Sequence, residues 1–287
     1  MKRALCIFLA VPALSFAQSP DVVVRLDVNP NYQIDSGGVS RFRWYDPLGK
    51  HSTVGISMIL EPGFRLLVTE RLQRMPGDDD QLDEWYLEDE GNWRVGKQYL
   101  PFGRQGILRE SAMAARVDTN LVIEGLPIAL AACDAGPGRQ RGLTGRLGGR
   151  IGLSFAVGSR FGAQGTSLGV VRDPDLAPGE GRGYRQVIGL DFWRRLGSWR
   201  VQGEAAFFRA GQTSLDKDMS VTDLQFSQGR ATLNTFTLGW SRDWAAVGDI
   251  YRAQAHVLMA RSLWLEPILR FKGDRFFDFA VSLRAKL

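Results

Sequence analysis

Cysteine is scarce in this sequence: the 287 residues contain two, Cys6 and Cys133. Cys6 lies in an N-terminal segment that we expect to be cleaved, so Cys133 stands alone and the mature chain is expected to hold no internal disulfide. A small secreted domain stapled by disulfides is therefore excluded.

Long hydrophobic runs and a strong net charge are also lacking. After residue 17 no uncharged apolar run approaches about 18 residues, which excludes a helical membrane protein. The formal charge is +5, and removing residues 1–17 with Lys2 and Arg3 leaves 34 basic against 31 acidic residues, or +3. Such a mild balance does not support a nucleic-acid partner, which would need a concentrated basic face.

The N-terminus is typical of a secretory signal peptide. Residues 1–3 form a short basic start, residues 4–14 are almost wholly apolar, and the small residues Ser15 and Ala17 precede Gln18. The apolar run is shorter than the roughly 20 residues that a membrane-spanning helix needs. We therefore expect a cleaved signal peptide, 1–17, followed by one exported domain, 18–287.

Alternation of apolar and polar residues with a period of two is the main pattern in this domain. At the C-terminus an apolar set alternates with a polar or small set: Phe277, Phe279, Val281, Leu283, Ala285 and Leu287 against Asp278, Ala280, Ser282, Arg284 and Lys286. Successive side chains of a strand point to opposite faces, and nearly every such segment carries a charge on its polar face. An unpaired charge in a sandwich core costs several kcal/mol, whereas a water-filled lumen removes that cost. The pattern predicts an all-β protein, a closed antiparallel transmembrane β-barrel.

Fifteen segments show the strand pattern, and turn sequences such as Glu90-Gly91-Asn92 separate several of them. The segments are 22–28, 40–46, 53–60, 64–74, 82–88, 92–99, 120–132, 143–157, 184–195, 198–209, 219–228, 231–243, 251–261, 263–271 and 276–287. Bacterial single-chain barrels have an even number of strands, so we predict about 14, with the weak segment 219–228 as a loop, and keep 16 as the alternative. Residues 100–118, 159–183 and 210–218 are expected to form longer extracellular loops.

Arginine dominates the polar faces that would line the lumen. The expected pore-lining residues are Arg25, Arg41, Arg43, Arg65, Arg71, Arg94, Arg146, Arg150, Arg200, Arg252, Arg270 and Arg284, together with Lys286. The expected acids are Asp27, Glu204, Glu266 and Asp278, with Asp191 and Asp243 as further candidates. Because fixed charges on a pore wall favour counter-ions, this roughly threefold excess predicts a weak anion preference. The alternative is that the arginines pair with acids across the barrel, or with lipopolysaccharide phosphates, and leave no net field.

Two features could point to chemistry, and each has a simpler interpretation. Asp78-Asp79-Asp80 follows Met75-Pro76-Gly77 and is better explained as a solvated loop tip than as a metal site. His51 lies in an expected loop and His256 is expected to face the lumen; neither has a serine two residues away, the spacing that outer-membrane phospholipases need. We therefore expect no catalytic residue, no metal and no cofactor, and the chain is not expected to be an enzyme.

One stretch resembles the phosphate-selective porin family. Residues 83–88 (Asp-Glu-Trp-Tyr-Leu-Glu) and 93–103 (Trp-Arg-Val-Gly-Lys-Gln-Tyr-Leu-Pro-Phe-Gly) are similar to two successive strands of that family. The resemblance implies an outer-membrane porin in which the Pro-Phe-Gly end leads into a loop that folds into the channel. Here that constriction loop would be residues 100–118, with Arg104 and Arg109. The family's phosphate ladder does not carry over, because no single loop holds a matching array of basic residues.

These patterns together predict a porin in the outer membrane of a diderm bacterium that lets small hydrophilic solutes, anions preferentially, diffuse passively. The alternative is a non-conducting, plugged barrel with a structural or docking role, since Gly145, Gly148, Gly149 and Gly152 would permit close packing of an inserted loop. Expected partners are outer-membrane lipid, lipopolysaccharide and the solutes. The last strand resembles the C-terminal signal strand of outer-membrane barrels, which implies recognition by the barrel-assembly machinery. The family resemblance implies that the chain can form an oligomer, because trimers are common among porins. No residue of the sequence marks an interface.

Overall fold

The computed structural model describes residues 21–73, 81–109, 111–119, 126–134, 141–161, 184–209, 218–230, 233–244 and 249–286. No helix in this part of the chain is long and apolar enough to cross a membrane. The predicted signal peptide, 1–17, the Asp78-Asp79-Asp80 run and Leu287 lie outside the described residues. So do most of the predicted loops 159–183 and 210–218.

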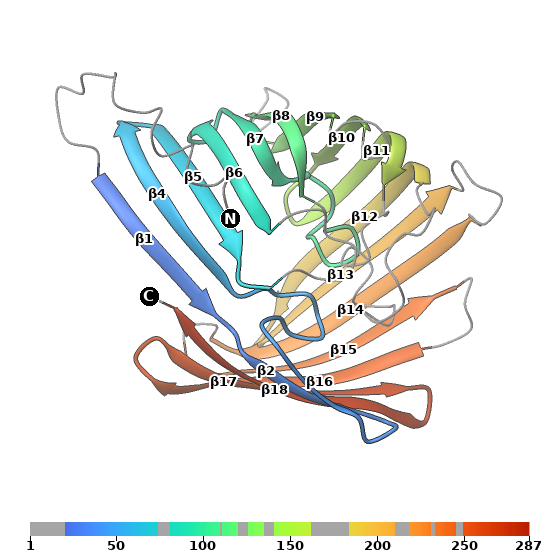
Figure 1. The fold of residues 1–287 in the computed structure, drawn as a ribbon. Helices are drawn as coiled ribbons and strands as arrows, with labels where there is room; N and C mark the ends of the chain where they lie inside the picture. The colour runs from blue at the N-terminus through green and yellow to red at the C-terminus, as the bar shows by residue number, and fades with distance from the viewer. Residues whose placement is uncertain are drawn as a thin grey trace.

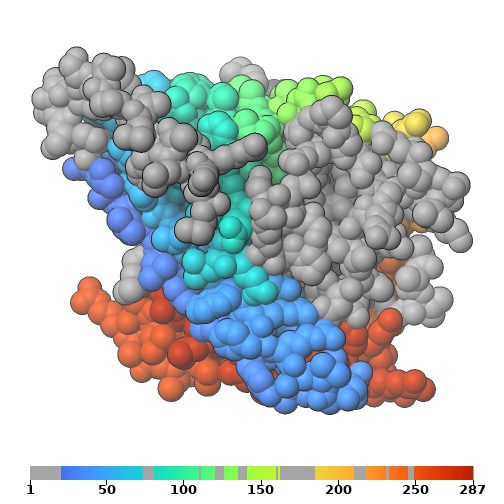
Figure 2. Space-filling view, viewed as in Figure 1, coloured from blue at the N-terminus to red at the C-terminus, as the bar shows by residue number. Residues whose placement is uncertain are grey.

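The described residues form one closed antiparallel sheet of eighteen strand segments. They are β1 (Asp21–Val28), β2 (Asn31–Asp35), β3 (Ser40–Arg43), β4 (Thr53–Glu61), β5 (Phe64–Arg71), β6 (Leu82–Asp89), β7 (Trp93–Tyr99), β8 (Ser111–Thr119), β9 (Ile128–Asp134), β10 (Arg141–Leu147), β11 (Ile151–Phe161), β12 (Tyr184–Leu196), β13 (Trp199–Arg209), β14 (Met219–Gly229), β15 (Thr235–Asp243), β16 (Asp249–Ala260), β17 (Leu263–Lys272) and β18 (Arg275–Lys286). Figure 1 shows them surrounding a central space. The sheet closes where β18 pairs with β1 and β2, and Figure 2 shows the blue first strands beside the red last strands.

Sixteen barrel strands arise from these eighteen segments, because two barrel strands are each divided. β1 and β2 keep one continuous register against β18, from Asp27 opposite Lys286 to Asp35 opposite Asp278. On their other side β4 pairs with β1 and β3 pairs with β2, so β3 and β4 are two halves of the next strand. Over the described residues the prediction of 14 strands is therefore wrong, and the alternative of 16 is confirmed.

The errors in the predicted strands have identifiable causes. The predicted strands omit β2 and β8, exclude β14 as a loop, and join β10 and β11 into the single segment 143–157. β10 and β11 are separated at Gly148, whose φ of 115° suits glycine in a tight turn. β8 escapes notice because its inward side chains, among them Ala112 and Ala114, are small and apolar. They pack against a buried segment rather than water, so the polar half of the alternation is missing.

The outer face of the barrel is apolar and the inner face is mostly polar. In β11, for example, Ile151 and Leu153 are 68% and 54% exposed, whereas Ser154 is buried. The predicted alternation in β18 is likewise confirmed from Asp278 onward. A β-bulge opposite Arg270 interrupts it and places the Phe277 ring against the Arg270 guanidinium, 4.9 Å from ring centroid to Cζ.

The two rims differ in their connections. Turns at 62–63, 90–92, 148–150, 197–198 and 261–262 lie at one end, here called the turn rim. The connection 100–109 and the turns 36–39 and 273–274 start from the opposite end, the loop rim. The predicted turn sequence Glu90-Gly91-Asn92 lies between β6 and β7, as expected.

Candidate pore and its lining

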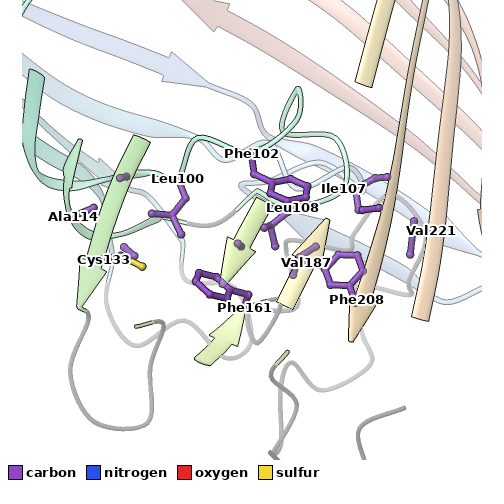
Figure 3. Close-up of a cluster of buried hydrophobic side chains, with 14 of the residues drawn as sticks. Leu100, Phe102, Ile107, Leu108, Ala114, Cys133, Phe161, Val187, Phe208 and Val221 are labelled. Carbon is purple, nitrogen blue, oxygen red and sulfur yellow. The ribbon is translucent and has the colours of Figure 1, made fainter. Parts of the chain in front are cut away.

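The connection between β7 and β8, residues 100–109, enters the space enclosed by the strands (Figure 1). This β7–β8 segment has four buried apolar side chains, Leu100, Phe102, Ile107 and Leu108. They join a cluster with inward side chains of β8, β9 and β11 to β14, including Ala112, Cys133, Phe161, Val187, Phe208 and Val221 (Figure 3). Burial of this apolar surface holds the segment against one side of the inner wall.

Polar contacts hold the turn of the segment. The backbone N–H of Gly103 donates to Ser154 Oγ at 2.9 Å, and the N–H groups of Arg104 and Gly106 donate to Glu204 Oε2 at 3.3 and 3.0 Å. Gly103 has a φ of 49°, and a Cβ there would lie 1.9 Å from Glu204 Oε1. A glycine is therefore needed for this close approach. Of the predicted loop 100–118, residues 100–109 lie inside the barrel, whereas the remainder from Ser111 onward belongs to β8.

A second segment inside the barrel, residues 44–52, joins β3 to β4 (Figure 1). It is a small hairpin, here called the β3–β4 hairpin, with a bridge between Tyr45 and His51. The Asp46 carboxylate accepts the backbone N–H groups of Leu48 and Lys50 at 2.8 and 2.9 Å. The predicted strand 40–46 runs into this hairpin, which the period-two pattern does not predict. Its signal is the turn sequence Asp46-Pro47-Leu48-Gly49, placed between two halves of one strand.

His51 is buried in this hairpin. Burial, and the positive charges of Arg71 and Arg109 nearby, lower the pKa of its imidazole to about 3. His51 is therefore neutral near pH 7. Burial raises the pKa of the neighbouring Asp46 carboxyl group.

Most of the predicted pore-lining arginines contact carboxylates. The pairs are Arg41–Asp35, Arg65–Glu88, Arg71–Asp83, Arg94–Glu88, Arg146–Asp191, Arg252–Asp223, Arg270–Asp278 and Arg284–Asp27. Four of these acids, Asp35, Asp83, Glu88 and Asp223, are absent from the acids expected in the lumen. Asp223 is missed because its strand, β14, is taken for a loop. The cationic excess inside the barrel is therefore smaller than the sequence predicts.

A group of arginines surrounds Trp193 on the inner face of β12. The guanidinium carbons of Arg104, Arg150 and Arg200 lie 5.9, 5.8 and 5.4 Å from the centre of its ring. Arg104 is also 3.7 Å from Asp191, which pairs more closely with Arg146 at 2.7 Å. Trp193 therefore serves as a platform for cations.

The other predicted residues are dispersed. Arg43 lies over the ring of Tyr45 at 5.2 Å, and Arg109 lies over Tyr99 at 5.1 Å. Arg25 is exposed on β1.

His256, which is predicted to face the lumen beside Arg252, lies on the inner face of β16. Its Nδ1 atom is 2.5 Å from Glu266 Oε1, and its ring stacks on Trp264. The contact binds His256 to a neighbouring strand, while Arg252 pairs with Asp223 instead.

Two cavities border the β7–β8 segment. The first, about 250 Å³, separates the segment from the β3–β4 hairpin and is lined by Leu48, Lys50, Arg104, Gln105, Gly106, Arg109, Gln202, Gly203, Glu204, Asp223, Gln225, Arg252 and Gln254. The second, about 400 Å³, includes residues of the turn rim and is lined by Gly91, Pro101, Phe102, Gly103, Gln105, Arg116, Asp118, Thr119, Pro127, Ile128, Ala129 and Arg146. Gln105 lines both, so the tip of the segment separates two polar spaces inside the barrel.

Comparison with known proteins identifies the fold. No protein family matches the sequence, and no curated sequence matches it. Among solved structures, a loop L8 deletion mutant of OmpT, an outer membrane protein of Vibrio cholerae, matches with a TM-score of 0.63 and 10% identity over 94% of this chain and 100% of that chain.

Two further solved structures agree with this match. The anion-selective porin from Comamonas acidovorans matches with a TM-score of 0.57 and 12% identity, over 94% of this chain and 100% of that chain. OmpF of Salmonella typhi, in a complex with daunomycin, matches with a TM-score of 0.60 and 9% identity, over 93% of this chain and 98% of that chain. The closer resemblance to phosphate-selective porins stays a prediction. At such low identities the likeness concerns the fold alone, and this chain has the fold of porins.

Proposed function

We propose that this protein is an outer-membrane porin through which small hydrophilic solutes diffuse passively. The observation that carries the proposal is the interior of the barrel. It is polar, and its inserted segment leaves a polar cavity on each of two sides, of about 250 and 400 Å³. A barrel of this size is wide enough for an aqueous channel, which an inserted segment narrows without closing.

The outer surface supports a place in a membrane. Large apolar side chains stand outward on many strands, among them Val117, Leu143, Leu153, Ile188, Leu190, Leu238 and Leu283. A soluble protein exposes few contiguous apolar patches of such extent, whereas the outward face of a membrane barrel meets lipid. In the proposed orientation the turn rim faces the periplasm of a diderm bacterium, and the apolar wall contacts lipid and lipopolysaccharide.

An anion preference follows from how the charges are satisfied. Glu204 accepts two backbone N–H groups, and Asp223 accepts bonds from Ser241, Arg252 and Gln225. The hydrogen bonds of these two carboxylates are therefore made with groups of the protein. By contrast, Arg150 and Arg200 have only ring contacts with Trp193 among the described interactions. Cations left available on the wall favour anions in transit.

Single-channel recording in a planar bilayer tests this function. The purified protein is expected to give stable ohmic current steps. In a KCl gradient its reversal potential is expected to be displaced from zero towards the equilibrium potential of chloride. The double variant R150Q/R200Q is expected to conduct with its reversal potential shifted towards zero, because two available cations are removed.

A matched double variant serves as the control. R261Q/R275Q removes the same charge from two exposed arginines outside the proposed path, one at each rim, and is expected to keep the parent's reversal potential. A clear preference for cations would refute the anion preference alone. Absence of channel current from protein that still shows heat-modifiable migration on a gel would refute the porin function. It would favour a non-conducting barrel with a docking role.

A further inference from the structure

The β3–β4 hairpin is an insertion into a barrel strand. Asp27 of β1 pairs with Thr53, and Asn31 of β2 pairs with Arg43. Three residues, 28–30, separate the paired positions on one strand, whereas nine residues, 44–52, separate their partners on the other. The divided strand therefore carries six extra residues. Because six is even, the inward and outward alternation of the strand is the same on both sides of the hairpin.

The extra residues contact the barrel wall at β17, which is separated from the divided strand by β18 and the β1–β2 strand. Arg270 of β17 donates to the carbonyl oxygen of Pro47 at 3.4 Å, and Lys50 Nζ lies 3.9 Å from the carboxylate of Glu266 on the same strand. At the base of the hairpin, Ser52 Oγ accepts the backbone N–H of Asn29 at 2.7 Å. These contacts, with the two N–H bonds to Asp46, hold the hairpin in place.

The hairpin faces the β7–β8 segment. Leu48 and Lys50 line the same 250 Å³ cavity as Arg104, Gln105 and Arg109 of that segment. This cavity is therefore bounded by two inserted elements, with β13, β14 and β16 completing its wall.

Lys50 keeps much of its charge available to this cavity. The carboxylate of Glu266 is shared among three partners: Lys50 at 3.9 Å, Arg284 at 3.7 Å and His256 at 2.5 Å. Lys50 has the longest of these contacts, and its side chain is 36% exposed. A distant, shared counter-charge neutralises an ammonium group only weakly.

We propose that the β3–β4 hairpin is a second constriction element of the pore and that Lys50 is the cation it presents to small anions in transit. The inference rests on the proposed porin function. It assigns the narrowest part of the path to two inserted elements, and it makes a mid-strand insertion a determinant of conductance and ionic preference.

A deletion variant tests the steric part. Removing residues 46–51 and changing Ser52→Leu leaves Trp44, Tyr45 and one leucine opposite residues 28–30, so the ladder between β3 and β4 can continue without a change of register. Single-channel conductance is expected to rise above that of the parent, because the hairpin no longer occupies the lumen. A folded deletion variant, shown by heat-modifiable migration, with the parent's conductance would overturn the proposal.

Variants at Lys50 test the site without disturbing the hairpin backbone. K50Q is expected to shift the reversal potential towards zero, while the control K272Q, which removes one exposed cation at the loop rim, is not. In K50C, an anionic thiol-specific methanethiosulfonate reagent is expected to lower the current stepwise. The parent chain serves as the reagent control, because Cys133 is 3% exposed.

The outcomes separate the two proposals. Silence of the unmodified protein would overturn the porin function, and the constriction inference with it. Two results with a conducting parent would overturn only the inference about the hairpin. One is a K50C current that does not change when the reagent is added, and the other is an equal reversal potential in the K50Q and K272Q variants.

Discussion

At the scale of single residues, buried charge in this barrel is tolerated because it is paired. Arg270 is fully buried, yet its guanidinium contacts the Asp278 carboxylate through two nitrogens. Gln33 donates a further bond to Asp278 at 2.6 Å. Isolated ions would be costly to remove from water, and these contacts offset that cost.

The variant R270A tests this account. It leaves the Asp278 carboxylate buried without its counter-charge, so the free energy of unfolding is expected to fall by about 3–5 kcal/mol. The measurement is urea-induced unfolding from lipid vesicles. The control R141A removes an exposed pair, Arg141–Asp134 at 3.1 Å with side chains 59% and 61% exposed, and is expected to cost less than about 1 kcal/mol. Equal losses in the two variants would contradict the account.

At the scale of elements, the two inserted segments are held by different forces. The β7–β8 segment is anchored by apolar packing, with the Phe102 ring so close to the β12 backbone that a Cβ on Gly189 would lie 2.6 Å from Phe102 Cζ. No residue of the β3–β4 hairpin belongs to that apolar cluster, and hydrogen bonds to Asp46 and to the wall hold the hairpin. The first element should therefore respond to changes in volume, and the second to changes in polar groups.

The variant F102A follows from the apolar anchoring. Removing the ring leaves a cavity beneath the β7–β8 segment, at a local cost of about 3–5 kcal/mol, so the segment is expected to fluctuate. Open-channel current noise is the measurement, and it should increase over the parent. The control F226A removes an outward ring of β14 that is 40% exposed; noise that rises equally in both variants would show that the segment is not anchored by Phe102.

At the scale of the whole molecule, the barrel is inverted relative to a soluble domain. Large apolar side chains stand on its outer surface, and the charged side chains buried inside include the pairs Arg252–Asp223 and Arg270–Asp278. The proposed function needs both properties at once, since the outer wall must match hydrocarbon and the inner wall must match water.

A charge on the outer wall should therefore oppose assembly. L153R places a guanidinium near the start of β11, on its outward face and at a position that is 54% exposed. It is expected to destabilise the membrane-inserted barrel by about 1–3 kcal/mol, between the costs at the membrane interface and at the midplane. The yield of the heat-modifiable folded form in membranes measures it. L153M preserves the apolar character and volume as a control. Normal folding of L153R would mean that this face does not meet lipid.

The sequence by itself determined the class of fold and the two faces of most strands, because a period of two follows directly from strand geometry. It did so for β11 and β18, where lipid and water impose opposite demands on alternate residues. It failed at β8, where the inward neighbours are apolar, and at β14, whose weak pattern led segment 219–228, with Asp223, to be set aside as a loop. The resemblance at residues 83–88 and 93–103 predicts an inward loop at 100–118; residues 100–109 lie inside the barrel, whereas Ser111 onward belongs to β8.

Only the tertiary structure decided which charges meet and how the lumen is divided. Asp278 pairs with Arg270, and Glu204 accepts the N–H groups of a segment about a hundred residues away in the chain. Lys50 shares a cavity with Arg104 because a six-residue insertion leaves its strand and projects into the lumen. Periodicity is local and reports the environment of each side chain, whereas these contacts depend on the closure and register of sixteen strands at once.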